Sequence, residues 1–144
     1  MKNIYILNGP NLNLLGKRQP EIYGSETLSD IENWLNDLPE TESHTITWFQ
    51  SNHEGDLINR LHEALGNTDG VIINPGALTH YSYALRDAIS SVNIPTVEVH
   101  LSDIYSREIF RKVSVIKDVC IKQISGKGKL GYLEGLKKLL SVFD

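Results

Sequence analysis

Short apolar runs alternate with longer amphipathic segments along the whole chain. The runs that we predict to be strands cover residues 4–7, 45–49, 71–73, 96–99 and 119–124. Between them, apolar residues recur every three or four positions, which is the spacing of helices that bury one face. We expect helices over residues 26–38, 53–65, 79–92 and 131–142, and a short helical segment that includes residues 107–111.

Capping and breaking residues mark the expected helix ends. Ser25 and Asn52 stand where side-chain caps of the first two helices are needed, and Thr79 stands at the start of the third. Pro39 follows the first helix and Gly66 the second, and both residue types end helices.

Strict alternation of strands and helices predicts an α/β fold with a parallel sheet covered by helices on both faces. Five strands in a chain of this length suit a flavodoxin-like three-layer sandwich with the strand order 2-1-3-4-5 and right-handed crossovers. We find no repeat, linker or low-complexity segment, so residues 1–144 are expected to form a single domain. The loop from Gly9 to Gly24 is long for such a fold, and we interpret it as a lid or binding loop.

Polar clusters follow three of the predicted strands. They are Asn8 to Asn11, Asn74 to His80, and Glu98 to Ser102. Parallel strands place their carboxyl ends at one edge of the sheet, which is where open α/β sheets bind ligands. We therefore predict one crevice that gathers Asn, His, Glu and Ser side chains.

Composition excludes several classes of partner. The 144 residues are 40% hydrophobic and 22% charged with a net charge of −4, and no basic stripe suggests nucleic acid. No apolar stretch approaches the roughly 18 residues that span a membrane. The single cysteine, Cys120, lies in an apolar run and is expected to be an inert buried thiol. With no signal-peptide pattern at the N-terminus, we expect a cytoplasmic protein.

Glu98 and His100 are the first candidates for chemistry. They lie two apart at the end of a strand and so point to the same side of the sheet. A carboxylate that orients an imidazole suits a general acid or base. A purely structural ion pair explains the same pattern equally well.

Two further pairs lie at helical spacing. His80 and Asp87 are about two turns apart and are expected to share a face of the third helix near the sheet edge. Arg107 and Arg111 are four apart and could clamp a carboxylate or phosphate. Solvated surface faces remain alternatives for both pairs.

The long loop holds Arg18 and Tyr23. A nearby guanidinium favours a phenolate and can lower the pKa of a Tyr, usually ~10, by about 1–3 units. Together they could form a base without a metal, although the local sequence alone favours a loop Arg beside a packed Tyr. No spacing typical of zinc, calcium or a phosphate-binding loop occurs.

Several long motifs resemble one family over nearly the whole chain, type II 3-dehydroquinate dehydratase. The motifs are Asn8-Gly-Pro-Asn-Leu-Asn-Leu-Leu-Gly16, Gln50-Ser-Asn-His-Glu-Gly55, Asn74-Pro-Gly-Ala77 and Glu98-Val-His-Leu-Ser102, with Arg107-Glu108 and Phe110-Arg111 continuing the pattern. The resemblance implies a reversible anti dehydration of 3-dehydroquinate to 3-dehydroshikimate through an enolate, without metal or cofactor. This step belongs to the shikimate pathway of chorismate and aromatic amino acid biosynthesis.

The resemblance also implies a role for each matching residue. Tyr23 would be the phenolate base, and Arg18 would lower its pKa. Asn11 and Asn74 would hold the enolate oxygen, Asn74 through a water. His100 would be the acid, oriented by the Glu98 carboxylate. Leu101 and Ser102 would bind the substrate carboxylate, and His80 and Arg111 would bind ring hydroxyls. Asp87 would reach the site of a neighbouring subunit.

The resemblance further implies homo-oligomers, trimers packed into a dodecamer. The chain departs from the family pattern at Asp103, where Asn is usual, and at Leu78, Tyr81 and Gln19. Of these, Asp103 places an extra carboxylate near the expected anion site.

A non-catalytic flavodoxin-like binding module is the alternative. A phosphoacceptor module needs acidic residues after the first strand, and a flavin module needs a Ser/Thr-rich loop there. Asn8, Gly9 and Asn11 supply neither.

Overall fold

The computed structural model describes residues 1–143, apart from the side chain of Tyr23. Within this range parallel strands form one sheet with the order β2-β1-β3-β4-β5, which confirms the predicted α/β fold. The strands are β1 (Asn3–Asn8), β2 (Thr45–Gln50), β3 (Gly70–Asn74), β4 (Thr96–His100) and β5 (Lys122–Ser125).

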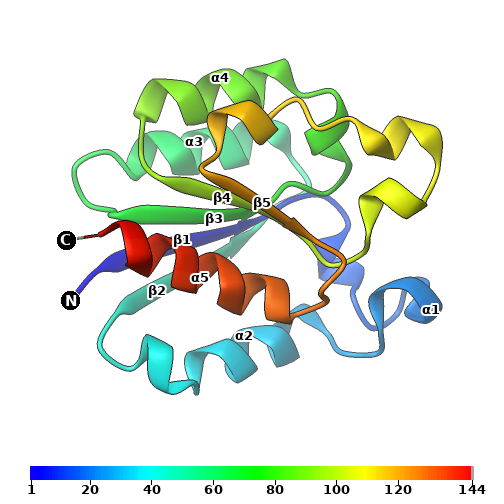
Figure 1. The fold of residues 1–144 in the computed structure, drawn as a ribbon, viewed down its shortest axis with the longest axis horizontal. Coiled ribbons are helices and arrows are strands. Elements are labelled where there is room, and N and C mark those ends of the chain that lie inside the picture. Colours follow the sequence, from blue (N-terminus) through cyan, green and yellow to red (C-terminus); the bar gives the residue numbers. More distant parts are fainter. Residues whose placement is uncertain (144) are drawn as a thin grey trace.

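Helices cover both faces of the sheet (Figure 1). The helices α2 (Leu28–Asn36) and α5 (Leu130–Val142) lie on one face, and α3 (Glu54–Glu63) and α4 (Tyr83–Val92) lie on the other. The short α1 (Pro20–Tyr23) projects from the sheet edge within the long loop after β1. None of the described helices has the length and apolarity that crossing a bilayer requires.

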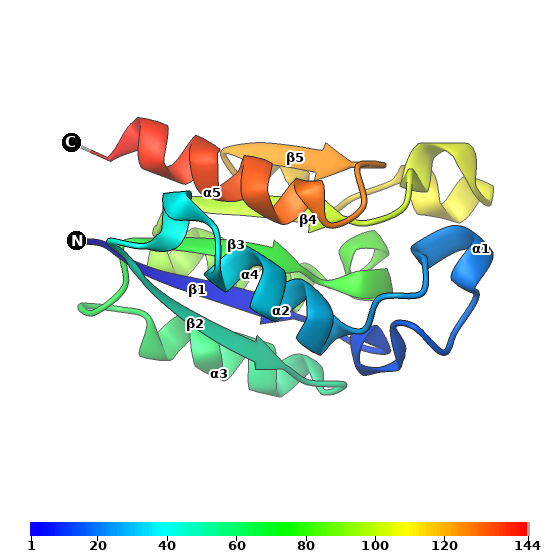
Figure 2. The ribbon, with the colours of Figure 1, turned by 90° about the horizontal axis from the view of Figure 1, so that it is seen from below.

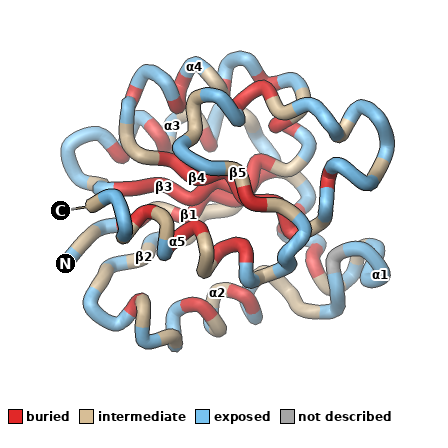
Figure 3. The backbone as a smooth tube through the Cα atoms, viewed as in Figure 1, coloured by how far each residue is buried: buried red, intermediate tan, exposed pale blue. Residues whose placement is uncertain are grey.

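Each face of the sheet has its own apolar core. Figure 3 shows buried residues along the strands and on the helices that cover them. Alternate residues of a strand point to opposite faces, so Ile4 and Ile6 of β1 pack beneath α2 and α5 while Leu7 packs against α3 and α4. The central strands β3 and β4 are buried along their whole length. This burial on both faces is typical of a parallel sheet.

The strand register brings the polar clusters to one edge. Asn8 of β1 pairs with Asn74 of β3, and β4 runs beside β3 from Thr96 onward. Figure 2 shows the carboxyl ends of the strands, α1 and the segment after β4 at one end of the molecule, with both termini at the other. The prediction that the polar clusters lie at one edge of the sheet is therefore confirmed.

Two predicted helix caps are wrong. Thr27, not Ser25, caps α2, because its hydroxyl accepts from the Asp30 N–H while the Asp30 carboxylate accepts from the Thr27 N–H. Asn52 does not cap α3, because its Oδ1 atom accepts instead from the backbone N–H of Asn11 over 2.9 Å.

The predicted helix over residues 79–92 is two elements. Gly76–His80 forms a 3₁₀ helix, and α4 begins only at Tyr83, where the Ser82 hydroxyl caps it by accepting from the Leu85 N–H. His80 and Asp87 therefore do not share a helix face, because the chain turns between them. The apolar spacing continues across the break, which is why periodicity alone missed it.

The last strand begins later than predicted. Lys117–Val119 forms a 3₁₀ turn, and β5 begins at Lys122. The ladder with β4 begins with the N–H of Ile121 donating to the carbonyl of Thr96, the first residue of β4. Residues 119 and 120 precede the point at which β4 offers a partner.

The expected helical segment over residues 107–111 is also divided. Ile104–Ser106 and Ile109–Lys112 form separate 3₁₀ helices, with Arg107 between them and Arg111 in the second.

Candidate active site

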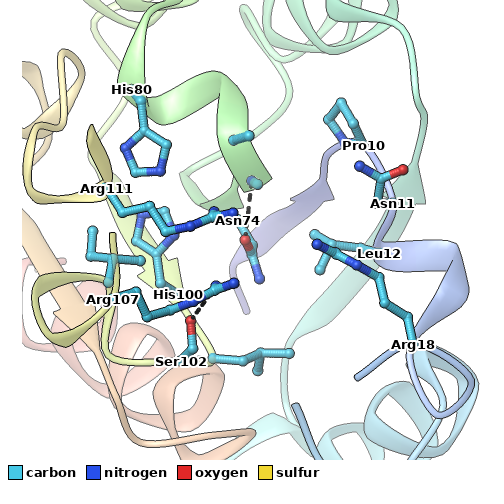
Figure 4. A pocket seen from close by; sticks show the side chains of 14 residues that line it. Pro10, Asn11, Leu12, Arg18, Asn74, His80, His100, Ser102, Arg107 and Arg111 are labelled. Carbon is cyan, nitrogen blue, oxygen red and sulfur yellow. Dashed lines mark hydrogen bonds between the residues drawn. The ribbon is translucent and has the colours of Figure 1, made fainter. Parts of the chain in front are cut away.

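A pocket of about 200 Å³ opens at the carboxyl edge of the sheet (Figure 4). The loop after β1 forms one wall, and the segments after β3 and β4 form the floor and the other wall. Among the described residues it gathers most of the side chains predicted from sequence: Asn11, Arg18, Asn74, His80, His100, Leu101, Ser102 and Arg111.

The first two polar clusters contact each other closely at the floor of the pocket. The Gly9 N–H donates to the carbonyl of Asn74 over 2.8 Å. A Cβ atom on Gly9 would lie 2.5 Å from the carbonyl oxygen of Pro75, and one on Gly76 would lie 2.9 Å from that of Pro10. Both positions therefore need glycine for the loops to meet.

Glu98 and His100 form the hydrogen-bonded pair that their spacing predicted. Nε2 of His100 lies 2.6 Å from Oε2 of Glu98, and both side chains are buried. The carboxylate can only accept, so Nε2 carries the proton and Nδ1 is left to serve the pocket. This arrangement fits an imidazole that gives or takes a proton at Nδ1.

Two hydroxyls complete the surroundings of the Glu98 carboxylate. Thr79 donates to Oε2 over 2.5 Å, and Ser114 lies 2.9 Å from both oxygens. Burial alone would raise the pKa of Glu98, but the hydrogen bonds and charge of His100, with those of Thr79 and Ser114, hold that pKa below its usual value of 4.5. Glu98 is thus an ionised carboxylate in the interior, as an orienting group requires.

The Asn74 side chain is held from two sides. Its Oδ1 accepts from the Gly76 N–H at 3.3 Å, and its Nδ2 donates to the Tyr132 hydroxyl at 3.2 Å. One Nδ2 hydrogen remains for the pocket, which Asn74 lines.

Asn11 lies in a left-handed backbone conformation with φ of 72°. Its N–H donates to Oδ1 of Asn52, which also accepts from Gln50 over 3.2 Å, and Gln50 donates to the Gly9 carbonyl as well. The left-handed region costs energy for a residue with a Cβ, although Asn tolerates it best. The Gln50–Asn52 contacts therefore keep Asn11 at the pocket wall.

His80 presents a hydrogen-bond acceptor to the pocket. Its Nδ1 lies 2.7 Å from the carbonyl oxygen of Val113, which can only accept, so Nδ1 carries the proton. Burial lowers the pKa of His80, and the charges of His100 and Arg111 add to that effect against the opposing hydrogen bond to Val113. The neutral ring leaves Nε2 with a lone pair suited to a substrate hydroxyl.

Positive charge surrounds the rest of the pocket. Arg18, Arg107 and Arg111 line it, and Nη1 of Arg107 donates to the Ser102 hydroxyl at 3.2 Å. Glu108 pairs with Arg111 over 3.2 Å, and the hydrogen bond from Arg111 lowers the pKa of the Glu108 carboxyl. This end of the pocket suits an anionic group.

The other residues singled out in the sequence either do not line the pocket or lie outside the described residues. The Tyr23 side chain is outside the described residues. Asp87 is exposed on α4 and is not among the described residues that line the pocket. Asp103, the unusual carboxylate, accepts from the Tyr105 N–H and thereby caps the 3₁₀ helix Ile104–Ser106.

Most of the residues whose role the sequence did not reveal contact the site residues without lining the pocket. Arg107 was noted only as half of a pair, and Thr79 only as a helix start. Asn52 was noted only as a helix cap, and Ser114 and Tyr132 had no assigned role, although a Tyr hydroxyl on an otherwise apolar helix face was a usable signal for Tyr132. Across residues 1–143, no three His, Cys, Asp or Glu side chains are grouped as a metal site would require.

Comparison with known proteins gives a consistent result. The model of the dehydroquinase class II family matches residues 2–140. The chain is 55% identical over 141 residues to the 3-dehydroquinate dehydratase of Bacillus pumilus, covering 98% of this chain and 96% of that one. It is 54% identical to the protein of the same name in Bacillus subtilis, covering 98% and 95% of the two chains.

Solved structures of the same family superpose closely on this chain. The type II dehydroquinase from Butyrivibrio crossotus superposes with a TM-score of 0.94 at 46% identity, covering 96% of this chain and 97% of that one. The type II dehydroquinase from Propionibacterium acnes superposes with a TM-score of 0.92 at 37% identity, covering 98% and 97%.

Proposed function

The chain belongs to the class II dehydroquinase family, and from that membership we propose that its pocket dehydrates 3-dehydroquinate to 3-dehydroshikimate through an enolate. The chain acts as a 3-dehydroquinate dehydratase, in the step of the shikimate pathway that leads to chorismate and the aromatic amino acids. The non-catalytic binding module is not favoured, because relatives that match nearly the full length carry the enzyme's name. Residues 1–144 would act as one catalytic domain.

The proposed reaction begins at the wall formed by the loop after β1. Tyr23, as a phenolate, removes the proton next to the ketone; the electron pair of that C–H bond forms the C=C bond of the enolate, and the π pair of the C=O bond moves to the ketone oxygen. Arg18 supplies the positive charge that favours the phenolate over the phenol. The Asn11 side chain, and the Asn74 amide through a water, stabilise the enolate oxygen.

The hydroxyl leaves toward the opposite wall. As the enolate collapses, the C=O bond re-forms, the electrons of the enolate C=C bond form the new double bond, and the C–O bond breaks. A proton carried on Nδ1 of His100 passes to the departing oxygen to give water. The single observation that carries this assignment is the pair His100–Glu98, which aims a correctly held imidazole at the pocket. Figure 4 shows His100 across the pocket from Arg18, which the proposal places beside the base.

Binding of the substrate falls to the remaining pocket residues. Leu101 and Ser102, with Arg107 beside the Ser102 hydroxyl, suit the substrate carboxylate. His80 accepts from a ring hydroxyl and Arg111 donates to another. Because base, enolate donors and acid are all side chains, the proposed mechanism uses neither metal nor cofactor.

We also propose that the enzyme is a homo-oligomer, a dodecamer of four trimers, in the cytoplasm. Large apolar side chains are exposed on the segments that carry His80 and Arg111, and such patches are typical of interfaces: Tyr81, Tyr83, Ile109, Phe110 and Val113. Asp87, exposed on α4, would reach the pocket of a neighbouring copy. Light scattering tests the assembly, and a monomer would contradict it.

The activity is tested by adding 3-dehydroquinate to purified protein and following the ultraviolet absorbance of the enone product. We expect turnover that persists after treatment with a chelator. Tyr23→Phe should reduce kcat to near zero while circular dichroism stays unchanged, and Tyr5→Phe, on the amino half of β1, is the matched control. Absence of product from the wild-type protein would refute the function, and full activity of Tyr23→Phe would refute the base.

A further inference from the structure

A buried chain of hydrogen bonds connects α5 to the pocket. Tyr132 donates its hydroxyl proton to Oδ1 of Asn8 over 2.5 Å and accepts from Nδ2 of Asn74 over 3.2 Å. Asn8 and Tyr132 are fully buried and Asn74 is 2% exposed. Of these three side chains only Asn74 lines the pocket.

The direction of each hydrogen bond in the chain is determined. Oδ1 of Asn74 faces the Gly76 N–H, a donor, so the Nδ2 of Asn74 must face Tyr132. Tyr132 has one proton, and Oδ1 of Asn8 is the acceptor that takes it. Burial raises the pKa of Tyr132, so the hydroxyl keeps that proton. The Asn74 amide thus has one orientation, with an N–H left for the pocket.

The fold brings the three residues together from distant parts of the sequence. Asn8 and Asn74 end adjacent strands in register and point to the face covered by α5. Gly131 lets α5 approach the sheet, since a Cβ there would lie 3.0 Å from Cγ1 of Val99. The next residue, Tyr132, then packs its ring 5.6 Å from that of Trp48 and extends its hydroxyl to the strand ends.

Three polar side chains in an otherwise apolar layer are costly for stability. The surrounding cluster consists mainly of aliphatic residues of the strands, of α2 and α5 and of the loop after β1. Apolar side chains of similar shape would pack there without the need to satisfy buried donors and acceptors. The Nδ2 of Asn8 has no hydrogen-bond partner among the described residues, so the network also leaves one buried donor unsatisfied. Stability therefore does not explain it.

We propose that Tyr132 is a positioning residue for the enolate step: its hydroxyl, anchored on Asn8, holds the Asn74 amide so that one N–H is directed into the pocket, toward the water through which Asn74 would stabilise the developing enolate oxygen. This inference rests on the proposed function. It assigns a role in the reaction to α5, which contributes no described residue to the pocket lining.

Tyr132→Phe tests the proposal, because it keeps the ring that contacts Trp48 and removes only the hydroxyl. Loss of a complete oxyanion donor costs about 10²–10³ in kcat, and a misoriented donor should cost less. We expect kcat to fall roughly tenfold, with KM within about twofold of the wild-type value. Tyr5→Phe should leave both unchanged.

The decisive measurement is the double variant. If Tyr132 acts through Asn74, adding Tyr132→Phe to Asn74→Ala should lower kcat no further. A tenfold additional loss would show an independent, structural effect and overturn the proposal, as would a wild-type kcat in Tyr132→Phe. Should Tyr132→Phe fail to fold, Asn8→Ala disturbs the same chain from its far end, and the same two outcomes apply.

A readout without substrate separates this proposal from the proposed function. The side-chain NH₂ signals of Asn74 in a ¹H–¹⁵N spectrum should shift and broaden in Tyr132→Phe and stay in place in Tyr5→Phe. Unchanged Asn74 signals would overturn the positioning role even if the enzyme is active. If Tyr132→Phe shows these shifts while the wild-type protein lacks turnover, only the proposed reaction is refuted.

Discussion

The Ser114 hydroxyl lies 2.9 Å from both carboxylate oxygens of Glu98, sixteen residues away in sequence. It also accepts from the backbone N–H of Lys117 over 3.1 Å. The segment after Arg111 is thereby tied to the buried carboxylate that orients His100. The acid of the proposed reaction thus depends on a loop outside every recognised motif.

Ser114→Ala should weaken both stability and catalysis. Hydrogen bonds to charged groups contribute about 1.5–3 kcal/mol, so we expect the free energy of unfolding to fall by about that amount. Since the Glu98 carboxylate would lose a donor and His100 its exact orientation, kcat should fall several-fold. Urea unfolding and steady-state assays measure the two effects.

Ser141→Ala is the matched control, because its hydroxyl donates to the Lys138 carbonyl on the exposed side of α5. Its effect should remain within about 0.5 kcal/mol. Equal effects of the two substitutions would contradict a special role for Ser114.

Stability should fall in acid through Glu98. Its pKa is lower in the folded protein than the usual 4.5, so the folded state is favoured wherever the carboxyl is ionised. The contribution is complete above about pH 4.5 and disappears as the pH falls through the folded-state pKa. Urea unfolding from pH 7 to pH 3 should show this decline, and Glu98→Gln should remove that part of it. An identical slope in both proteins would refute the assignment.

Asn52→Ala should disturb catalysis more than stability. The substitution removes the acceptor of the Asn11 N–H at an exposed position, so Asn11 can leave its left-handed conformation. We expect kcat to fall by roughly tenfold, as for a misplaced enolate donor, with an unchanged melting temperature. Asn33→Ala, at an exposed position of α2, should leave both values unaltered; a similar loss of kcat there would undermine the prediction.

Arg18→Ala should shift the pH dependence of kcat/KM. If Arg18 favours the phenolate through its charge, the kinetic pKa of the base rises by about 1 unit or more, and Arg18→Lys restores part of the shift. Rates measured from pH 6 to pH 10 provide the test. A profile lowered at every pH without displacement would mean that Arg18 binds substrate and does not activate the base.

The sheet was the most predictable part of the structure. Strands such as residues 4–7 and 71–73 are short apolar runs between turn residues, and their alternation with helices defined the order 2-1-3-4-5. Boundaries failed where a long-range contact decides them. Because Ser82 caps α4, the helix begins four residues after the apolar pattern suggests. The strand β5 begins only where its backbone can pair with β4, from the Ile121–Thr96 hydrogen bond onward.

The part of the site that lies at the carboxyl ends of the strands could be predicted from the sequence. Asn74, Glu98 and His100 follow from the rule for carboxyl ends of parallel strands, and Arg18 follows from the family motifs. Ser114, Asn52 and Tyr132 act on partners that lie 16, 41 and 124 residues away. No local pattern encodes such pairings, so only the folded chain reveals them.

The residues proposed as enolate donor and acid are supported by opposite layers of the molecule. Asn74 is held from the α2–α5 side through Tyr132, while Glu98 and His100 are held from the α3–α4 side through Thr79 and Ser114. Substitutions in one layer need not disturb the other. Evolution or a protein engineer can therefore adjust carbanion formation and leaving-group departure separately, by altering different cores of the same small domain.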